Sequence, residues 1–258
     1  MKRNRYYIFN EGCLLLCGKE FSSVPTELPK GIEIGEVRFF VDTDGEKCYV
    51  ARSNQENLPD GMMWMDLRES FHVLPEKEYR MAGKASELLY FDRHHRYCGL
   101  CGGPMEWSSA ISKRCTHCGE ELWPKLSTAI IVLIHRGKEA LLVKAKNFRR
   151  DYYGLVAGFV ETGESLEECV AREVMEETGL EVVETKYLFS LPNTYLYAGF
   201  LVHTLDQFFV CKVKEYAGLR AMDDVADSFW VPLEKVNPEE FGLNSVREGV
   251  KRFLKEYK

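Results

Sequence analysis

A glycine-containing loop followed by a helix crowded with glutamate constrains this chain more than any other feature. Residues 158–180 read GFVETGESLEECVAREVMEETGL. Ser165 and Glu168 have the spacing of a capping box, in which each side chain bonds the other residue's backbone N–H, and Gly179 supplies the left-handed residue that ends many helices. We therefore predict a helix over 166–178 with well-marked ends.

Three glutamates of this helix lie within reach of one another. Glu173 precedes Glu176 by three residues and Glu177 by four, so it can meet either of them on one face. Each glutamate also follows an apolar residue by seven positions, which indicates a face turned toward protein. The alternative is a solvated acidic face, as most glutamate-rich helices have. Crowded, partly buried carboxylates need a cation to stay charged, and hard oxygen ligands favour Mg²⁺ or Mn²⁺.

The same segment resembles the Nudix family, because it contains the complete Nudix box at the expected spacing. Gly158 is followed six residues later by Glu164, and then by Arg-Glu-Val-x-Glu-Glu-x-Gly-Leu. So many fixed positions in so short a span make the match highly specific. The resemblance implies an α/β (α+β) fold, the Nudix α/β/α sandwich with a mixed sheet, and hydrolysis of a diphosphate by metal-activated water.

The resemblance also assigns roles to the residues that match the box. Arg172 would orient the glutamates through an ion pair, and Glu164 of the box would complete the catalytic set with Arg172, Glu173, Glu176 and Glu177. Glu177 would help to deprotonate the attacking water. The ligands of Mg²⁺ or Mn²⁺ would be Glu173, Glu176 and Glu177, joined by the backbone carbonyl of Ala157.

A later acidic segment offers one more ligand. Nudix proteins often add an acidic residue from a loop after the box, and AMDDVADSFWVPL contains Asp223, Asp224 and Asp227. We favour Asp224 as a further metal ligand. An acidic turn before a strand explains any one of the three equally well.

Four cysteines precede the predicted catalytic region in two tight pairs. Cys98 and Cys101 form one Cys-x-x-Cys knuckle, Cys115 and Cys118 form the other, and 13 residues separate them. This spacing predicts a structural zinc ribbon, since four thiolates leave Zn²⁺ no open position and the metal stabilises a segment that lacks a core. The nearby histidines are expected to be surface residues or neighbours of the ligands: His94, His95 and His117.

Length and composition place these motifs in a globular protein of several parts. The chain has 258 residues, of which 45% are hydrophobic and 29% charged, a soluble mixture long enough for more than one core. Short β-rich runs and a connecting helix predict a small N-terminal α+β domain at 1–95. The zinc ribbon is expected at 96–122 and the Nudix domain at 123–258, where STAIIVLIH predicts a buried strand.

Charge and the N-terminal residues limit the partners and the location. A net charge of −6 gives no global attraction to nucleic acid. The start MKRNRYYIFNEGCLLLC has a basic head, but Asn10, Glu11 and Gly12 interrupt the apolar run that a signal peptide or membrane span requires. We expect a cytoplasmic protein.

The order of the three parts resembles the NADH pyrophosphatase family across essentially the whole chain. HHRYCGLCG, the step Trp123-Pro124-Lys125 and YYGLVAGFVETGES look like the corresponding family segments. Members of that family split NADH, and often NAD⁺, into a nicotinamide mononucleotide and AMP, usually as homodimers, and some remove NAD caps from RNA. The resemblance implies these substrates and this assembly here.

One segment departs from the family pattern. The family's Ser-Gln-Pro-Trp-Pro-Phe-Pro stretch after the box appears as Ser190-Leu-Pro-Asn-Thr-Tyr-Leu196, which keeps only Ser190, Pro192 and an aromatic residue. The lost tryptophan and glutamine are natural ways to hold a nicotinamide or adenine ring. Besides Ser190, candidate substrate contacts are the aromatic residues Phe159, Trp123, Tyr195 and Tyr197, each equally well explained as ordinary core.

Two alternatives stay open. The same chemistry on ADP-ribose, FAD or another nucleoside diphosphate derivative would suit the altered stretch. A noncatalytic regulator would instead bind RNA or DNA through the ribbon and a basic run, although that run is equally suited to steering substrate phosphates. The run contains Lys144, Lys146, Arg149 and Arg150. An intact set of box carboxylates favours the enzyme.

Overall fold

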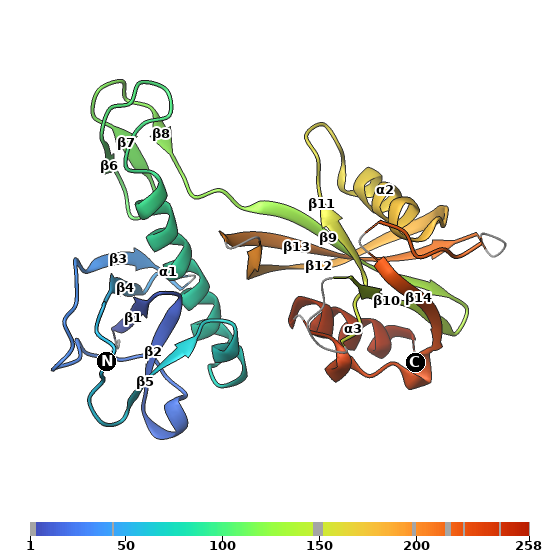
Figure 1. Cartoon of the computed structure of the whole chain (residues 1–258), viewed down its shortest axis with the longest axis horizontal. Coiled ribbons are helices and arrows are strands. Elements are labelled where there is room, and N and C mark those ends of the chain that lie inside the picture. Colours follow the sequence, from blue (N-terminus) through green and yellow to red (C-terminus); the bar gives the residue numbers. More distant parts are fainter. Residues whose placement is uncertain are drawn as a thin grey trace. The chain divides into compact units, whose positions relative to one another are not determined.

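The chain forms two units that are described separately below (Figure 1). The computed structural model describes residues 4–42, 44–146, 152–197, 200–214, 218–223, 225–242 and 244–257. The first unit groups Met1–Lys125 with Thr194–Val202, and the second groups Leu126–Asn193 with His203–Lys258. No helix in the described ranges is long and apolar enough to cross a bilayer.

The first unit begins with a five-stranded sheet in the order β3-β4-β1-β2-β5. Its strands are β1 (Arg5–Asn10), β2 (Cys13–Cys17), β3 (Arg38–Val41), β4 (Lys47–Arg52) and β5 (Met62–Asp66). Helix α1 (Glu76–His94) packs on it, since Met81, Ala85 and Leu88 share one buried cluster with Tyr7 and Leu14 of the sheet. This is the small α+β arrangement expected from the N-terminal sequence.

A second, three-stranded sheet carries the cysteine pairs. Strands β6 (Met105–Trp107), β7 (Lys113–Cys115) and β8 (Glu121–Leu122) pair antiparallel in that order. Its core is small: Cys98, Met105 and Cys115 are buried together, with Leu122 against them. The sheet is fixed to the end of α1, because the indole N–H of Trp107 donates to Asp92 Oδ1 at 2.9 Å and Lys113 Nζ lies 2.8 Å from the same oxygen.

The second unit is built on a six-stranded mixed sheet in the order β12-β13-β9-β10-β14, with β11 paired to β9. Strand β13 runs parallel to β9, whereas β10 and β11 are antiparallel to it. The strands are β9 (Ser127–Arg136), β10 (Glu139–Ala145), β11 (Val156–Phe159), β12 (Val182–Tyr197), β13 (Phe200–Val213) and β14 (Val225–Pro232). The predicted buried strand is therefore the centre of the sheet.

Two helices cover opposite faces of this sheet (Figure 1). Ile130 and Val132 of β9 share a core with Val170 and Val174 of α2 (Leu166–Thr178). The residues between them, such as Ile131, enter a second core with α3 (Asn244–Tyr257). A strand buried on both faces explains why its sequence is a continuous apolar run. The expected α/β/α sandwich with a mixed sheet is confirmed.

Short 3₁₀ helices complete the described structure at four places. They are η1 (Lys19–Phe21), η2 (Glu69–His72), η3 (Leu233–Lys235) and η4 (Pro238–Glu240).

Candidate active site and metal sites

Helix α2 begins and ends where its sequence predicts. Ser165 Oγ accepts the backbone N–H of Glu168 at 3.2 Å, and the Glu168 carboxylate accepts the backbone N–H of Ser165 at 2.8 Å. Gly179 ends the helix with a left-handed φ of 69°. Both ends of the helix are thus held by local bonds, which fixes the face that its glutamates present.

Arg172 is the centre of the acidic cluster. Its Nε and Nη2 donate to the two oxygens of Glu164 at 2.7 and 2.9 Å. Its Nη1 donates to Glu173 Oε1 at 2.8 Å and to Glu176 Oε2 at 3.1 Å. Nη2 also donates to the carbonyl of Phe159 at 3.0 Å, at the end of β11. The planar, permanently charged guanidinium of Arg172 thus links α2 to the preceding loop at Glu164 and to the end of strand β11 at Phe159.

These contacts set the charge states around the guanidinium. The hydrogen bonds from Arg172 and from the backbone N–H of Glu161 lower the pKa of Glu164 to about 2. The same pairing with Glu164 raises the pKa of Arg172 further above its ordinary value. Burial raises the pKa of Glu173, and the neighbouring Arg172 opposes that shift. Glu164 therefore acts as a fixed anion that holds Arg172 in place.

Gly158 leaves the space that Glu173 occupies. A Cβ at residue 158 would lie 1.9 Å from Glu173 Oε1 and 2.0 Å from its Cδ. No side chain tolerates such an approach, so the carboxylate of Glu173 packs directly against the backbone of β11. Residue 158 pairs with Ile130 of the central strand, which holds this backbone in place.

The three glutamates occupy different environments on α2. Glu173 and Glu177 are buried, whereas the side chain of Glu176 is half exposed. Glu173 and Glu176 converge on one nitrogen of Arg172, and Glu177 lies one residue beyond Glu176 on the helix. Buried carboxylate oxygens require a cation or strong donors to remain charged, and hard cations prefer such oxygens. The donor set therefore suits Mg²⁺ or Mn²⁺, the cofactors of Nudix chemistry.

The other acidic candidates lie on and before β14. Asp227 is exposed on that strand and is paired in register with Lys144. Asp223 is exposed with a left-handed φ of 46°, and its carbonyl accepts a hydrogen bond from Lys146. Asp224, the favoured ligand, lies outside the described residues, as do Arg149 and Arg150 of the basic run.

The predicted substrate contacts are spread over both units. Phe159 is 40% exposed at the end of β11, and Ser190 is partly buried on β12. Trp123, in the first unit, is 53% exposed. The side chains of Tyr195 and Tyr197 lie outside the part of the chain that is described. Ala157 is an exposed residue of β11, paired with Ile131.

The thiol of Cys169, a residue for which the sequence predicts no role, joins the Arg172 network. Arg172 Nη2 lies 3.5 Å from Cys169 Sγ, and that sulfur lies 3.5 Å from the Phe159 carbonyl oxygen to which it donates. Burial raises the pKa of the thiol to about 12, so it remains protonated. The only signal in the sequence is its position three residues before Arg172, on the same helix face.

The four cysteine sulfurs form the second candidate metal site. All four lie within 4.8 Å of one another, with Cys98 and Cys118 separated by 3.7 Å and Cys101 and Cys115 by 3.5 Å. Tetrahedral zinc with Zn–S bonds of about 2.3 Å places its sulfurs about 3.8 Å apart, so the spacing fits Zn²⁺. The ribbon binds this zinc in a structural role, as expected.

Removing one zinc ligand is expected to empty the ribbon. Cys101→Ser should lower the zinc content from about one ion per chain to near zero, since a structural site needs all four ligands. Metal analysis of the purified protein measures this directly. Cys13→Ser, outside the cluster, is the control and should keep its zinc. Full zinc content in Cys101→Ser would show that the four thiolates are not the ligands.

The pairing of Glu164 with Arg172 predicts a pH-dependent stability. The pKa of Glu164 is lowered from 4.5 to about 2, so its ionised form stabilises the folded chain above pH 4.5 and loses this effect as the pH falls through 2. Glu164→Gln should therefore lower Tm at neutral pH, and its difference from the unsubstituted chain should shrink in acid. Thermal unfolding across pH measures this, with exposed Glu167→Gln as control; a pH-independent difference would contradict the assignment.

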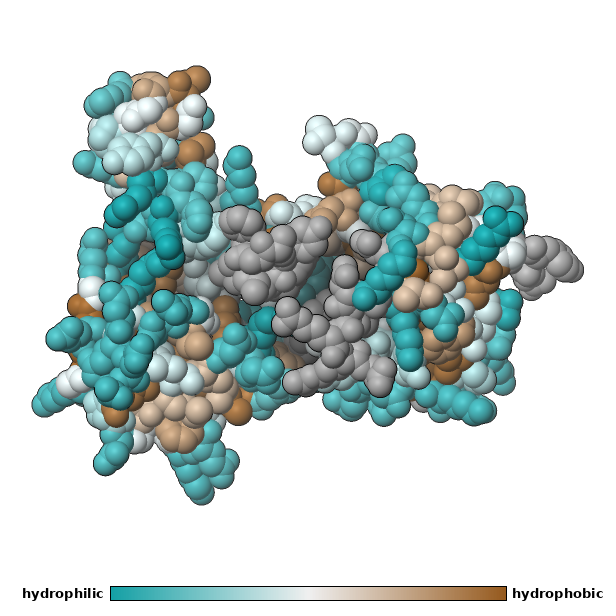
Figure 2. Space-filling view, in the orientation of Figure 1, coloured by the Kyte–Doolittle hydropathy of each residue, from teal (hydrophilic) through white to brown (hydrophobic). Residues whose placement is uncertain are grey.

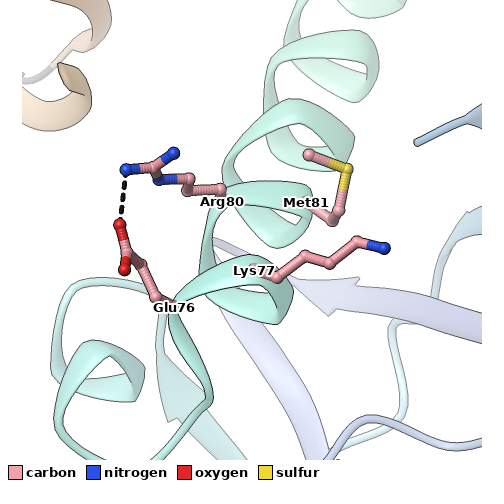
Figure 3. Close-up of a pocket in the computed structure, with 4 residues that line it drawn as sticks. All are labelled: Glu76, Lys77, Arg80 and Met81. Carbon is pink, nitrogen blue, oxygen red and sulfur yellow. Dashed lines mark hydrogen bonds and ion pairs between the residues drawn. The ribbon is translucent and has the colours of Figure 1, made fainter. Parts of the chain in front are cut away.

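One hollow lies on helix α1 of the first unit (Figure 3). It has a volume of about 190 Å³ and is lined by Glu76, Lys77, Arg80 and Met81. Arg80 pairs with Glu76, and Lys77 lies 2.8 Å from the buried Asp42. All charges that line it are engaged in ion pairs, and we assign it no function. On the face shown in Figure 2, hydrophilic residues cover α2, the helix that carries the glutamates.

Comparison with known protein families matches three consecutive parts of the chain. An NADH pyrophosphatase-like rudimentary Nudix domain matches residues 3–90, an NADH pyrophosphatase zinc ribbon domain matches 93–122, and a Nudix domain matches 124–253. The last of these alone covers half of the chain.

Individual relatives agree with these matches. The NAD-capped RNA hydrolase NudC of Chromobacterium violaceum is 34% identical over 187 residues, which cover 72% of this chain and 69% of that protein. NudC of Deinococcus radiodurans is 36% identical over 207 residues, 78% of this chain and 72% of that protein. A crystal structure of a Nudix hydrolase from Nitrosomonas europaea aligns with a TM-score of 0.49 and 17% identity over 62% of this chain and 91% of that chain. The chain belongs to the Nudix hydrolases, in the NADH pyrophosphatase family that carries a zinc ribbon.

Proposed function

We propose that this chain hydrolyses the diphosphate bond of NADH and NAD⁺ and releases a nicotinamide mononucleotide and AMP. The observation that carries the proposal is the Arg172-centred cluster, which holds Glu173 and Glu176 beside the end of β11 with Glu177 next to them on the helix. The relatives named as NAD-capped RNA hydrolases support a dinucleotide as the substrate.

Each residue of the cluster has a proposed task. Glu173, Glu176 and Glu177 bind the divalent ions, together with the carbonyl of Ala157. The ions supply the Lewis acidity and the activated water of such hydrolases. Glu177 accepts the proton of the attacking water, and its burial keeps this carboxylate out of contact with bulk solvent.

Arg172 keeps these carboxylates in position and does not itself react. Its single positive charge offsets part of the negative charge of Glu173 and Glu176 before the ions bind, and its Nε and Nη2 donate to both oxygens of Glu164. Rigid support of this kind maintains the catalytic geometry through the reaction. Asp224 is proposed as one more ligand. Phe159, Trp123, Ser190 and Tyr195 are proposed as substrate contacts.

The wider assignments rest on the family. We propose that the domains are 1–95, 96–122 and 123–258, that the active form is a cytoplasmic homodimer, and that NAD-capped RNA is a further substrate. The relatives named as NAD-capped RNA hydrolases support the capped-RNA assignment, and this chain covers more than two thirds of the length of each of them. Light scattering of the purified chain measures the assembly.

A comparison of hydrolysis rates tests the substrate assignment. Initial rates are measured on NADH, NAD⁺, ADP-ribose and FAD with Mg²⁺ or Mn²⁺. A higher kcat/KM for NADH or NAD⁺ than for the others supports the proposal. A rate on ADP-ribose far above that on NADH would instead show that the altered 190–196 stretch has redirected specificity. Salt-dependent RNA binding without any hydrolysis would favour the alternative of a noncatalytic regulator that binds nucleic acid.

A further inference from the structure

The C-terminal end of helix α1 is capped by a lysine from the sheet that carries the cysteine pairs. The last carbonyl groups of a helix have no partner within the helix and must find donors elsewhere. Lys113 Nζ of β7 donates to the carbonyl of His95 at 2.9 Å and to the carbonyl of Asp92 at 3.3 Å. The same nitrogen lies 2.8 Å from Asp92 Oδ1. A residue of another sheet therefore completes the end of α1.

Lys113 is a buried cation whose three N–H donors match these three acceptors. Only 3% of the residue is exposed, and a buried ammonium is tolerated when it is paired and hydrogen-bonded. Cations are also favoured at the C-terminus of a helix, where the helix dipole is negative. The next residue, Arg114, lies on the opposite face of β7: its side chain is 59% exposed and pairs with Glu121 of the same sheet. The alternation of the strand thus directs Lys113, and not Arg114, at α1.

The position of Lys113 depends on the zinc site. Lys113 and the zinc ligand Cys115 share the buried face of β7, with exposed Arg114 between them. Residues two apart on a strand have Cα atoms about 7 Å apart, so the cap lies close to the metal. The buried cluster of this sheet consists of three residues, two of which are zinc ligands, and so small a core does not hold three short strands together without metal. Zinc binding therefore also holds Lys113 against α1.

Trp107 of β6 makes a second link between the two sheets of the first unit. Its indole N–H donates to Asp92 Oδ1 at 2.9 Å, the oxygen that also faces Lys113. The indole ring meets the buried ring of Phe91 edge-on, with centroids 5.7 Å apart, and the guanidinium of Arg38 from β3 lies 4.0 Å from the indole centroid. One carboxylate on α1 thus joins two strands of the ribbon to the helix, beside a contact with the N-terminal sheet.

We propose that the zinc ribbon serves as the C-terminal cap of helix α1, so that zinc occupancy controls the order of this helix end through Lys113 and Asp92. When zinc is bound, Lys113 covers the last carbonyls of the helix and neutralises Asp92. When zinc is lost, the ribbon unfolds, these groups open to water and the last turns of α1 fray. The loosening reaches the core of the first unit, because Ala85 and Leu88 in the preceding turns pack in one buried cluster with Tyr7 of the N-terminal sheet.

Amide hydrogen exchange of the whole chain, with zinc bound and after removal by excess chelator, tests the coupling without any substrate. Zinc removal is expected to speed exchange in the segment 86–95 about 10-fold, while the segment 246–254 of α3 stays unchanged. Lys113→Met should show the faster exchange at 86–95 while metal analysis still finds its zinc, and chelation should add little further change there. Arg114→Met, which removes the neighbouring cation from the exposed face of β7, is the matched control and should exchange as the unsubstituted chain does.

Asp92→Asn provides the test if Lys113→Met loses its zinc or does not fold, because the side chain of Asp92 is 43% exposed. An acidic residue in the last turn of a helix opposes the helix dipole, so neutralising it would slow exchange if Asp92 acted on the helix alone. The capping role predicts faster exchange at 86–95 with zinc still bound. Slower exchange in Asp92→Asn, unchanged exchange at 86–95 after zinc removal from the unsubstituted chain, or an equal effect of zinc removal in Lys113→Met and the unsubstituted chain would overturn the inference.

Discussion

Replacing Glu177 by glutamine is expected to lower kcat for dinucleotide hydrolysis by about 10³-fold. The amide keeps the size of the side chain but carries no charge and accepts no proton from water, and Glu177 is a buried residue of the helix that carries the acidic cluster. Initial rates at saturating Mg²⁺ or Mn²⁺ give the effect, and circular dichroism shows whether the fold is kept.

The matched control for this substitution is Glu167→Gln on the same helix. Glu167 is exposed in the first turn of the helix, so its replacement removes the same charge without touching the site. We expect its kcat to stay within about twofold of the unsubstituted chain. If Glu177→Gln keeps more than about a tenth of the activity, the residue is not the base assigned here.

The second large effect is expected at Gly158, which carries no functional group. In Gly158→Ala the added methyl would fall 1.9 Å from Glu173 Oε1, so the carboxylate must leave its place beside Arg172. Displacement of a catalytic group by about 1 Å costs about 10²-fold in rate, and we expect kcat to fall by at least that factor. Rates measured over a metal titration show the loss, together with weaker apparent metal binding.

Gly218→Ala is the control for this variant, because a Cβ at residue 218 meets no atom within 4 Å. It should behave as the unsubstituted chain in rate and Tm. A Gly158→Ala protein with unchanged kcat would mean that the position of Glu173 against β11 is not needed for the reaction.

The local parts of this structure follow from the sequence because short-range bonds determine them. The predicted helix at 166–178 and its capping box are present with the same bounds, since Ser165, Glu168 and Gly179 act within one or two turns. The apolar run at 127–135 is the central strand because it fills two cores at once. The cysteine knuckles likewise lie together through their own turns.

The tertiary contacts of the site were not predictable in this way. The sequence indicated that three carboxylates share one face of the helix. It did not show that both oxygens of Glu164 accept hydrogen bonds from Arg172, or that the missing side chain of Gly158 leaves the space that Glu173 occupies. Likewise, Asn193 of β12 contacts Ser245 of α3, which lies 52 residues further along the chain. Such contacts depend on the order of the strands and on how the helices pack against the sheet. Hydrophobic periodicity in the sequence predicts neither of these.

The most direct test of the account is to identify the products formed from NADH. The purified chain is incubated with NADH and Mg²⁺ or Mn²⁺, and the nucleotides are separated by chromatography beside the Glu177→Gln protein. The account predicts AMP and reduced nicotinamide mononucleotide in equal amounts, almost absent with the variant. Release of free nicotinamide, which requires cleavage of a glycosidic bond, or equal product formation by Glu177→Gln, would contradict it.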